Sequence, residues 1–198
     1  MAYSDFTLNK LEQKFGLLQR KTDLFQKPLR KIKPSRRLKA DLEDARLLPL
    51  LSEKAKSEFL IAPLLLELYR NNPHQFTIFS GFAFDVDNAN QLNGICDFLF
   101  SQYPDAAELR DPVFCMVEAK NRTIEEGFGQ CGAEMYAARL YNQAKNKTEI
   151  VHGAVTNGTE WVFMKLQNNE LLIDNYRYGI IELPQLLGAF QNIIDFYL

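Results

Sequence analysis

The fold of this chain follows from two stretches of sequence, GICDFLFS at residues 94–101 and PVFCMVEAK at residues 112–120. Both are rich in Phe, Val, Ile and Leu and lie between Asn, Asp, Gly and Pro, which is typical of strands. A third run of the same kind, FTIFSGFAF, occupies residues 76–84, and the segment at 85–93, DVDNANQLN, has the character of a hairpin connection. We therefore expect three consecutive strands.

Helical and further strand patterns surround these strands. An amphipathic helix is predicted over 6–20, and a second helical region over 42–69, where Pro63 should kink or divide the helix. A strong helix is expected over 123–143, then strands near 149–156, 160–166 and 170–176, and a closing helix near 184–197. This order predicts an α/β fold with a mixed central sheet flanked by helices.

The charge of the chain is nearly balanced but unevenly distributed. Lys and Arg number 23 against 25 Asp and Glu, which excludes a uniformly basic nucleic-acid coat. Residues 10–46, however, hold 12 bases and five acids, and the run KPLRKIKPSRRLK at 27–39 should be an exposed arm or loop. This arm is either a solvated linker or a contact for the phosphates of a polyanion. We expect residues 1–46 to form an N-terminal helix and basic arm, and residues 47–198 the folded domain.

No membrane or secretory segment is recognisable in the sequence. The longest dense apolar stretch runs from Phe59 to Leu66 and is closed by Glu67, far too early to span a bilayer. Three cysteines without CxxC spacing are expected to be reduced and buried. We therefore expect a cytoplasmic protein without a membrane partner.

Charged residues interrupt the two informative strands. Asp97 stands inside the apolar run at 95–100, and Glu118 and Lys120 end the next run on one face of the strand. Pairing of the two strands would bring Asp97 alongside Glu118, and two close carboxylates repel unless a cation neutralises them. Oxygen ligands favour Mg²⁺ or Mn²⁺. A Glu-x-Lys at a strand end can also be a solvent-exposed ion pair.

The pattern Asp97, twenty intervening residues, then Glu118-Ala119-Lys120 resembles the PD-(D/E)XK nuclease superfamily. This resemblance implies a restriction-endonuclease-like core over roughly residues 50–166. It also implies that Asp97 and Glu118 bind the metal and that Lys120 is the catalytic lysine. Cys96 stands where the name of the family has Pro.

Two accessory positions follow from the same resemblance. Many members carry a Glu on the helix before the first core strand, and the candidates here are Glu53, Glu58 and Glu67. Counting 100° per residue selects Glu58 as a metal-site residue and puts Glu53 on roughly the opposite side. Alternatively, Glu58 faces solvent or pairs with Lys54.

RecB-like relatives have a Gln and a Tyr on the helix that follows the Glu-x-Lys strand. The segment GQCGAEMY offers Gln130, Glu134 and Tyr136 for these positions. Gln130 and Glu134 are i, i+4 neighbours that can point towards the site together, whereas Tyr136 falls elsewhere around the helix.

These observations predict a metal-dependent nuclease that acts on nucleic acid, with DNA as the expected partner. One such site cuts one strand, so a homodimer would suit double-strand cleavage. The alternatives are a catalytically inactive module of the same fold that binds nucleic acid or protein, and a small interaction protein whose acidic cluster is incidental.

Overall fold

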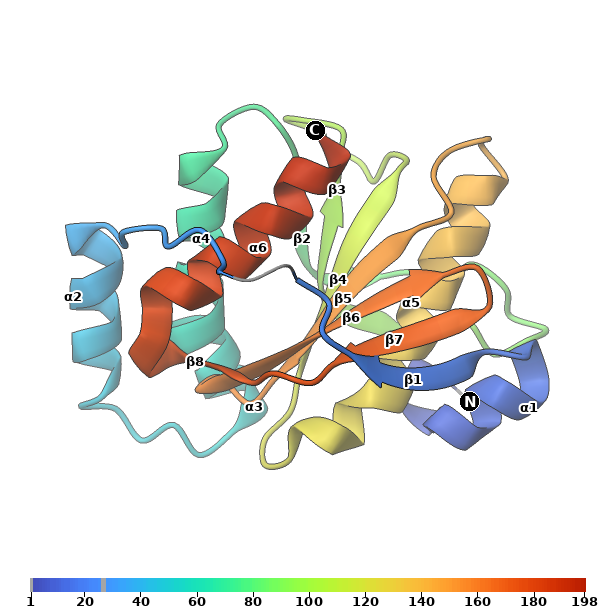
Figure 1. The fold of residues 1–198 in the computed structure, drawn as a ribbon, viewed down its shortest axis with the longest axis horizontal. Helices are drawn as coiled ribbons and strands as arrows, with labels where there is room; N and C mark the ends of the chain where they lie inside the picture. The colour runs from blue at the N-terminus through green and yellow to red at the C-terminus, as the bar shows by residue number, and fades with distance from the viewer. Residues whose placement is uncertain (1, 26–27) are drawn as a thin grey trace.

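The computed structural model describes residues 2–25 and 28–198, and a mixed sheet of eight strands forms its centre (Figure 1). The strands follow the spatial order β1-β7-β6-β5-β4-β3-β2, and β8 pairs with β6. Their bounds are Leu18–Thr22 (β1), Thr77–Ala83 (β2), Ile95–Ser101 (β3), Val113–Ala119 (β4), Val151–Thr156 (β5), Glu160–Gln167 (β6), Glu170–Asp174 (β7) and Tyr178–Gly179 (β8).

Helices cover both faces of this sheet (Figure 1). One face packs against α1 and α5, and the other against α2, α4 and α6. The helices are α1 (Leu8–Phe15), α2 (Arg36–Ala45), α3 (Glu53–Lys56), α4 (Ala62–Asn71), α5 (Phe128–Gln143) and α6 (Leu183–Tyr197), with a π turn η2 (Ser57–Ile61) and 3-10 turns η1 (Tyr3–Asp5), η3 (Ile124–Gly127) and η4 (Ile180–Glu182). No helix in the described part of the chain is long and apolar enough to cross a bilayer.

The α/β class and the mixed sheet are therefore confirmed. The three strands expected at 76–84, 94–101 and 112–120 are β2, β3 and β4, which pair as antiparallel neighbours. The strand β5 then runs parallel to β4, and α5 forms the crossover between them. A parallel neighbour requires such a crossover, and an amphipathic helix supplies it while covering the sheet.

The helix predicted over 6–20 is shorter than expected. Gly16 adopts a left-handed conformation (φ 67°) and its N–H donates to Glu12 O, so α1 ends there. The residues after Gly16 form β1, which pairs in parallel with β7 at the edge of the sheet. This long-range pairing overrides the helical periodicity of the segment.

The helical region around Pro63 changes its hydrogen-bond pattern instead of dividing. In the π turn η2, the N–H of Ala62 donates to Ser57 O, five residues back. Pro63 has no N–H, and its ring clashes with the carbonyl four residues earlier in a regular α-helix. The wider turn just before Pro63 accommodates this clash, and α4 continues from it.

The basic segment before α2 is a loop over residues 28–35 with its bases exposed, as expected, but it is not a free arm, because its apolar side chains pack against the domain, and residues 36–39 belong to α2. Leu29 and Leu38 are buried in the core on the α2, α4 and α6 face. The Oγ of Ser35 accepts from Leu38 N–H and caps α2, while the buried Glu67 accepts from the Ser35 N–H and hydroxyl. Lys27 lies outside the described residues.

The N-terminal residues belong to the same folded unit as the rest of the chain. Tyr3, Phe6 and Leu11 are buried against α5, and β1 extends the central sheet. The boundary expected between residues 46 and 47 falls just after α2, and the apolar side chains on the two sides of it share one core.

Candidate active site

Asp97 and Glu118 lie side by side at the same end of β3 and β4. The antiparallel register of these strands pairs Phe98 with Val117, and Asp97 and Glu118 are one residue beyond this pair. Asp97 Oδ2 accepts a hydrogen bond of 2.8 Å from the backbone N–H of Ala119. The sheet thus brings together two carboxylates that twenty intervening residues separate along the chain. Glu118 lies beside α5, and Asp97 lines a pocket beside α3 and η2.

The carboxylate of Glu118 is buried, and only one of its two oxygens has a cationic partner among the residues that the structure describes. Its side chain is 2% exposed, and Oε1 lies 2.7 Å from Lys120 Nζ. Its Oε2 is buried and accepts from no N–H group of the described residues, and the carboxyl group of Glu134 lies within hydrogen-bond reach of Glu118. Burial, together with the nearby charge of Asp97, raises the pKa of Glu118 to about 7, although Lys120 opposes this shift.

Lys120 donates to two partners at once. Its Nζ lies 2.7 Å from Glu118 Oε1 and 2.9 Å from Gln130 Oε1, on helix α5. Burial disfavours the ammonium, but the negative charges of Glu118, Glu53 and Asp97 outweigh this effect and raise the pKa of Lys120. The lysine therefore carries its positive charge at neutral pH.

Gln130 and Glu134 extend this group of polar side chains into the α5 face of the sheet. Gln130 Nε2 donates to Glu134 Oε1 at 3.2 Å. Glu134 is fully buried, and its carboxyl group contacts that of Glu118. Burial, then the charge of Glu118, raises the pKa of Glu134, and two carboxyl groups in contact are stable when a proton or a cation lies between them. Tyr136 instead stacks on Phe15 of α1.

Glu53 and Glu58 occupy different environments from those that the helical count predicts. The carboxylate of Glu53 accepts from the N–H of Asn121 at 3.0 Å, beside Lys120, and its charge raises the pKa of Asp97 after the larger effect of burial. The Glu58 side chain is 53% exposed and lies 3.9 Å from Lys54. The expectation that Glu53 faces away from the site is therefore wrong.

The π turn explains this difference. The 100° per residue count assumes i→i+4 bonds throughout, and the i→i+5 bond from Ala62 to Ser57 changes the angular spacing of the residues around the helix. Pro63 is the sequence signal that a uniform count would fail here. Both Glu53 and Glu58 line one pocket of about 420 Å³ together with Asp97, between this helical region and β2.

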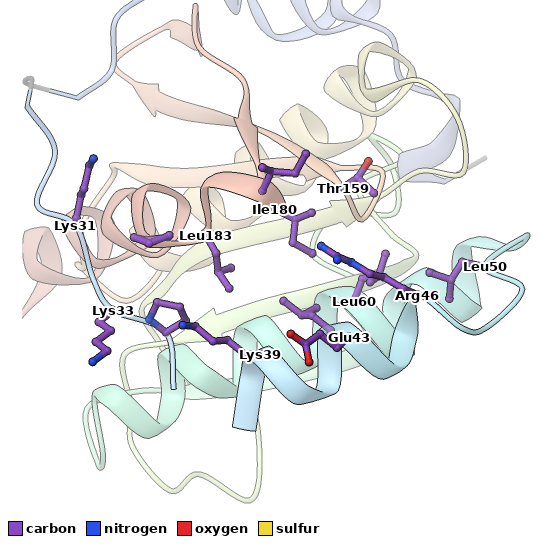
Figure 2. Close-up of a pocket in the computed structure, with 14 residues that line it drawn as sticks. Lys31, Lys33, Lys39, Glu43, Arg46, Leu50, Leu60, Thr159, Ile180 and Leu183 are labelled. Carbon is purple, nitrogen blue, oxygen red and sulfur yellow. The ribbon is translucent and has the colours of Figure 1, made fainter. Parts of the chain in front are cut away.

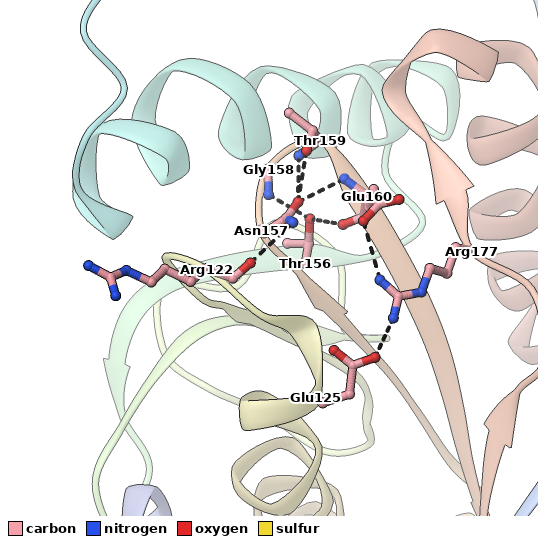
Figure 3. A network of polar contacts seen from close by, with 8 residues as sticks. All are labelled: Arg122, Glu125, Thr156, Asn157, Gly158, Thr159, Glu160 and Arg177. Carbon is pink, nitrogen blue, oxygen red and sulfur yellow. Dashed lines mark hydrogen bonds and ion pairs between the residues drawn. The ribbon is translucent and has the colours of Figure 1, made fainter.

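The loop that follows β4 is held on two sides. The N–H of Lys120 donates to Thr156 O at 2.7 Å, and the ammonium of Lys56 donates to Asn121 O. Asn157 donates to Arg122 O, and its Oδ1 accepts from the N–H groups of Thr159 and Glu160, which closes the β5–β6 hairpin (Figure 3).

A second set of contacts ties the same hairpin to η3. Arg177 pairs with Glu160, which directly follows the turn of the hairpin, and with Glu125 on η3 (Figure 3). These ion pairs are half-exposed, so each contributes little on its own. Together with the hairpin bonds they hold the loop at 120–122 in one position relative to β4 and so support the orientation of Lys120.

The carboxylates of this site suit a hard divalent cation that takes only some of its ligands from the protein. Among the described residues, no group of three or more His, Cys, Asp and Glu side chains is arranged as a metal site. Mg²⁺, however, is bound in many enzymes through one or two carboxylates, with water and substrate phosphate as its other ligands. The carboxylates of Asp97 and Glu118 supply such a pair.

Comparison with known proteins leaves the family of this chain open. The sequence matches no protein-family model and no curated protein sequence.

Proposed function

We propose that this protein is a Mg²⁺- or Mn²⁺-dependent nuclease of restriction-endonuclease-like fold that hydrolyses phosphodiester bonds in DNA. The observation that carries the proposal is the juxtaposition of Asp97, Glu118 and Lys120 at the paired ends of β3 and β4. The burial of Glu118 beside the carboxyl groups of Asp97 and Glu134 supports it further, because Lys120 alone cannot neutralise this group of acids and a divalent cation would.

Each residue of the site has a distinct role in this proposal. Asp97 and Glu118 hold the ion, which when bound polarises the scissile phosphate and lowers the pKa of a bound water. Lys120 keeps its proton, orients the attacking water and stabilises the charge that develops on the phosphate. Gln130 fixes the Lys120 ammonium, and Glu53 holds the loop that follows it.

The distribution of charge supports a polyanionic substrate. The bases of the N-terminal region remain exposed although its apolar side chains are packed, among them Arg36, Arg37, Lys39 and Arg46 on or beside α2. Such a surface can contact the phosphates of a nucleic acid, and these contacts do not distinguish one base sequence from another. Two copies of the chain would supply the two sites that double-strand cleavage needs. The three described cysteines are free and buried, which supports a protein of the reducing cytoplasm.

Cleavage by the purified protein tests the proposal. Supercoiled plasmid and a short linear duplex are incubated with Mg²⁺, with Mn²⁺ and with a chelator, and cleavage is expected only with the metals. The variants Asp97→Ala and Lys120→Ala should lose it while retaining the circular-dichroism spectrum of the folded protein. Glu149→Gln, at an exposed position outside the site, is the matched control.

The outcomes separate the candidate functions. Unchanged cleavage by either site variant would refute the assignment of residues. DNA binding without cleavage in any metal would instead identify a catalytically inactive module that binds nucleic acid. Binding that weakens steeply with salt would assign the affinity to phosphate contacts.

A further inference from the structure

A second pocket lies between α2 and the start of α6, on the opposite face of the sheet from α5. Its volume is about 650 Å³. Figure 2 shows Lys39 and Glu43 of α2, with Arg46 directly after this helix, on one side, facing Ile180 and Leu183 across the pocket. It shares no lining residue with the pocket beside Asp97. Its volume falls within the range of about 300–1,000 Å³ that small-molecule sites occupy.

The walls of this pocket are aliphatic. Leu42 and Leu60 come from α2 and η2, and Ile180, Leu183 and Pro184 from η4 and the beginning of α6. None of the described residues that line it is aromatic. A nucleobase would be expected to stack on an aromatic ring, and so an aliphatic body fits these walls better.

The rim of the pocket is positively charged. Lys31 and Lys33 of the segment before α2, with Lys39 and Arg46, stand against a single acid, Glu43. Within residues 2–25 and 28–198, none of these four cationic side chains forms an ion pair or a side-chain hydrogen bond. Unpaired cations around an apolar cavity complement a ligand that combines an apolar body with an anionic end.

We propose that this pocket binds a small organic anion with an aliphatic body and a terminal phosphate or carboxylate. The aliphatic body lies against Leu42 and Leu183, and the anionic end is held by Lys39 and Arg46. The side chain of Ile181, which is 89% exposed beside the pocket, becomes covered when the ligand binds. The site does not depend on the proposed nuclease activity.

Octyl phosphate, used below its micelle-forming concentration, is the probe for this site. Titration calorimetry with the whole chain should give saturable binding with one ligand per chain. Octyl glucoside has the same tail without charge, octylammonium carries the opposite charge, and inorganic phosphate has no tail. Each should bind at least tenfold more weakly than octyl phosphate, because each lacks one of the two complementary features.

Charge-matched variants locate the binding. The double variant Lys39→Gln/Arg46→Gln should weaken octyl phosphate at least tenfold, whereas Lys145→Gln/Lys147→Gln, which removes two exposed charges beyond α5, should change it less than twofold. Since Lys39 and Arg46 are exposed, their replacement leaves the core intact. Ile181→Ser should also weaken binding without affecting the charge.

Several results would overturn the proposal. The first is that octyl phosphate does not bind. The second is that octyl phosphate and octyl glucoside bind with equal affinity. The third is that the two double variants lose affinity for octyl phosphate to the same degree. Binding to vesicles of phosphatidic acid and phosphatidylcholine without binding of free octyl phosphate would replace the small ligand by a membrane surface. Displacement of octyl phosphate by an acidic amphipathic peptide alone, with the other probes inactive, would replace it by a protein partner.

Discussion

The ammonium of Lys120 lies 2.7 Å from Oε1 of Glu118, and the two residues project from the same face at the end of β4. Lys120 lies among the carboxyl groups of Asp97, Glu118 and Glu134, whose pKa values are all raised, chiefly by burial. The site therefore has more acidic groups than one lysine neutralises. Its stability should respond to protons and to added cations, and the first two predictions follow from this imbalance.

Protein stability should fall as pH rises through the titration of Glu118. The pKa of this residue is about 7 in the folded protein against 4.5 in the unfolded chain, so between these values the folded state holds a proton that the unfolded state has released. Glu118→Gln cannot titrate and should be more stable than the parent above pH 7, by on the order of 3 kcal/mol.

Urea unfolding at pH 5 and pH 8 measures this difference. The parent should lose stability between the two values to a greater degree than Glu118→Gln. The exposed variant Glu149→Gln controls for the loss of one acid and should follow the parent. Parallel pH profiles of the parent and Glu118→Gln would contradict the prediction.

Divalent cations should stabilise the protein at pH 8. At a free concentration of about 100 times Kd, an ion that binds only the folded state adds about 2.7 kcal/mol. For a chain of this size, such a gain raises Tm by several degrees. Differential scanning fluorimetry with Mg²⁺ and Mn²⁺ should show this rise in the parent and in Glu149→Gln. Asp97→Asn should not show it, and an equal rise in that variant would place the ion elsewhere.

Glu53 and Glu58 should differ in their importance for cleavage. Glu53→Gln should lower the cleavage rate about tenfold, in the range typical for residues that orient a metal ligand or its neighbours. Its carboxylate accepts from Asn121 N–H next to Lys120, and its charge acts on Asp97.

Glu58→Gln is the matched variant on the same helical region and removes the same charge. Its carboxylate pairs with the exposed Lys54, so a change of less than twofold is expected. Rates measured on the same DNA substrate with Mg²⁺ decide between the two. The opposite ranking would make Glu58 the carboxylate that serves the site.

The packing of the basic N-terminal segment against α6 can be tested at Gly188. A Cβ at this position would lie 1.9 Å from the backbone oxygen of Arg30, so Gly188→Ala must displace the segment or the helix. We expect a destabilisation of about 2–3 kcal/mol in urea unfolding. Gly179→Ala, whose Cβ would have its nearest neighbour at 3.8 Å, should stay within about 0.5 kcal/mol of the parent. Equal stabilities would mean that the segment is not packed there.

Much of the fold can be predicted from the local patterns of apolar and polar residues in the sequence. The strands β2, β3 and β4 and the helix α5 were expected at their observed places, because alternation and apolar stripes are properties of consecutive residues. The sequence also predicted that Asp97 and Glu118 are neighbours. Antiparallel pairing of successive strands leaves few registers that keep the apolar side chains inside.

Other features depend on contacts between distant segments. Residues 18–22 form a strand because β7 offers its free edge, and residues 28–39 pack because α2, α4 and α6 bury their leucines. Glu53 reaches the loop after Lys120 because the π turn before Pro63 alters the helical phase, and the aliphatic pocket exists only where α2 meets α6. A sequence specifies the side chains that can meet, but long-range packing selects the pairs that do.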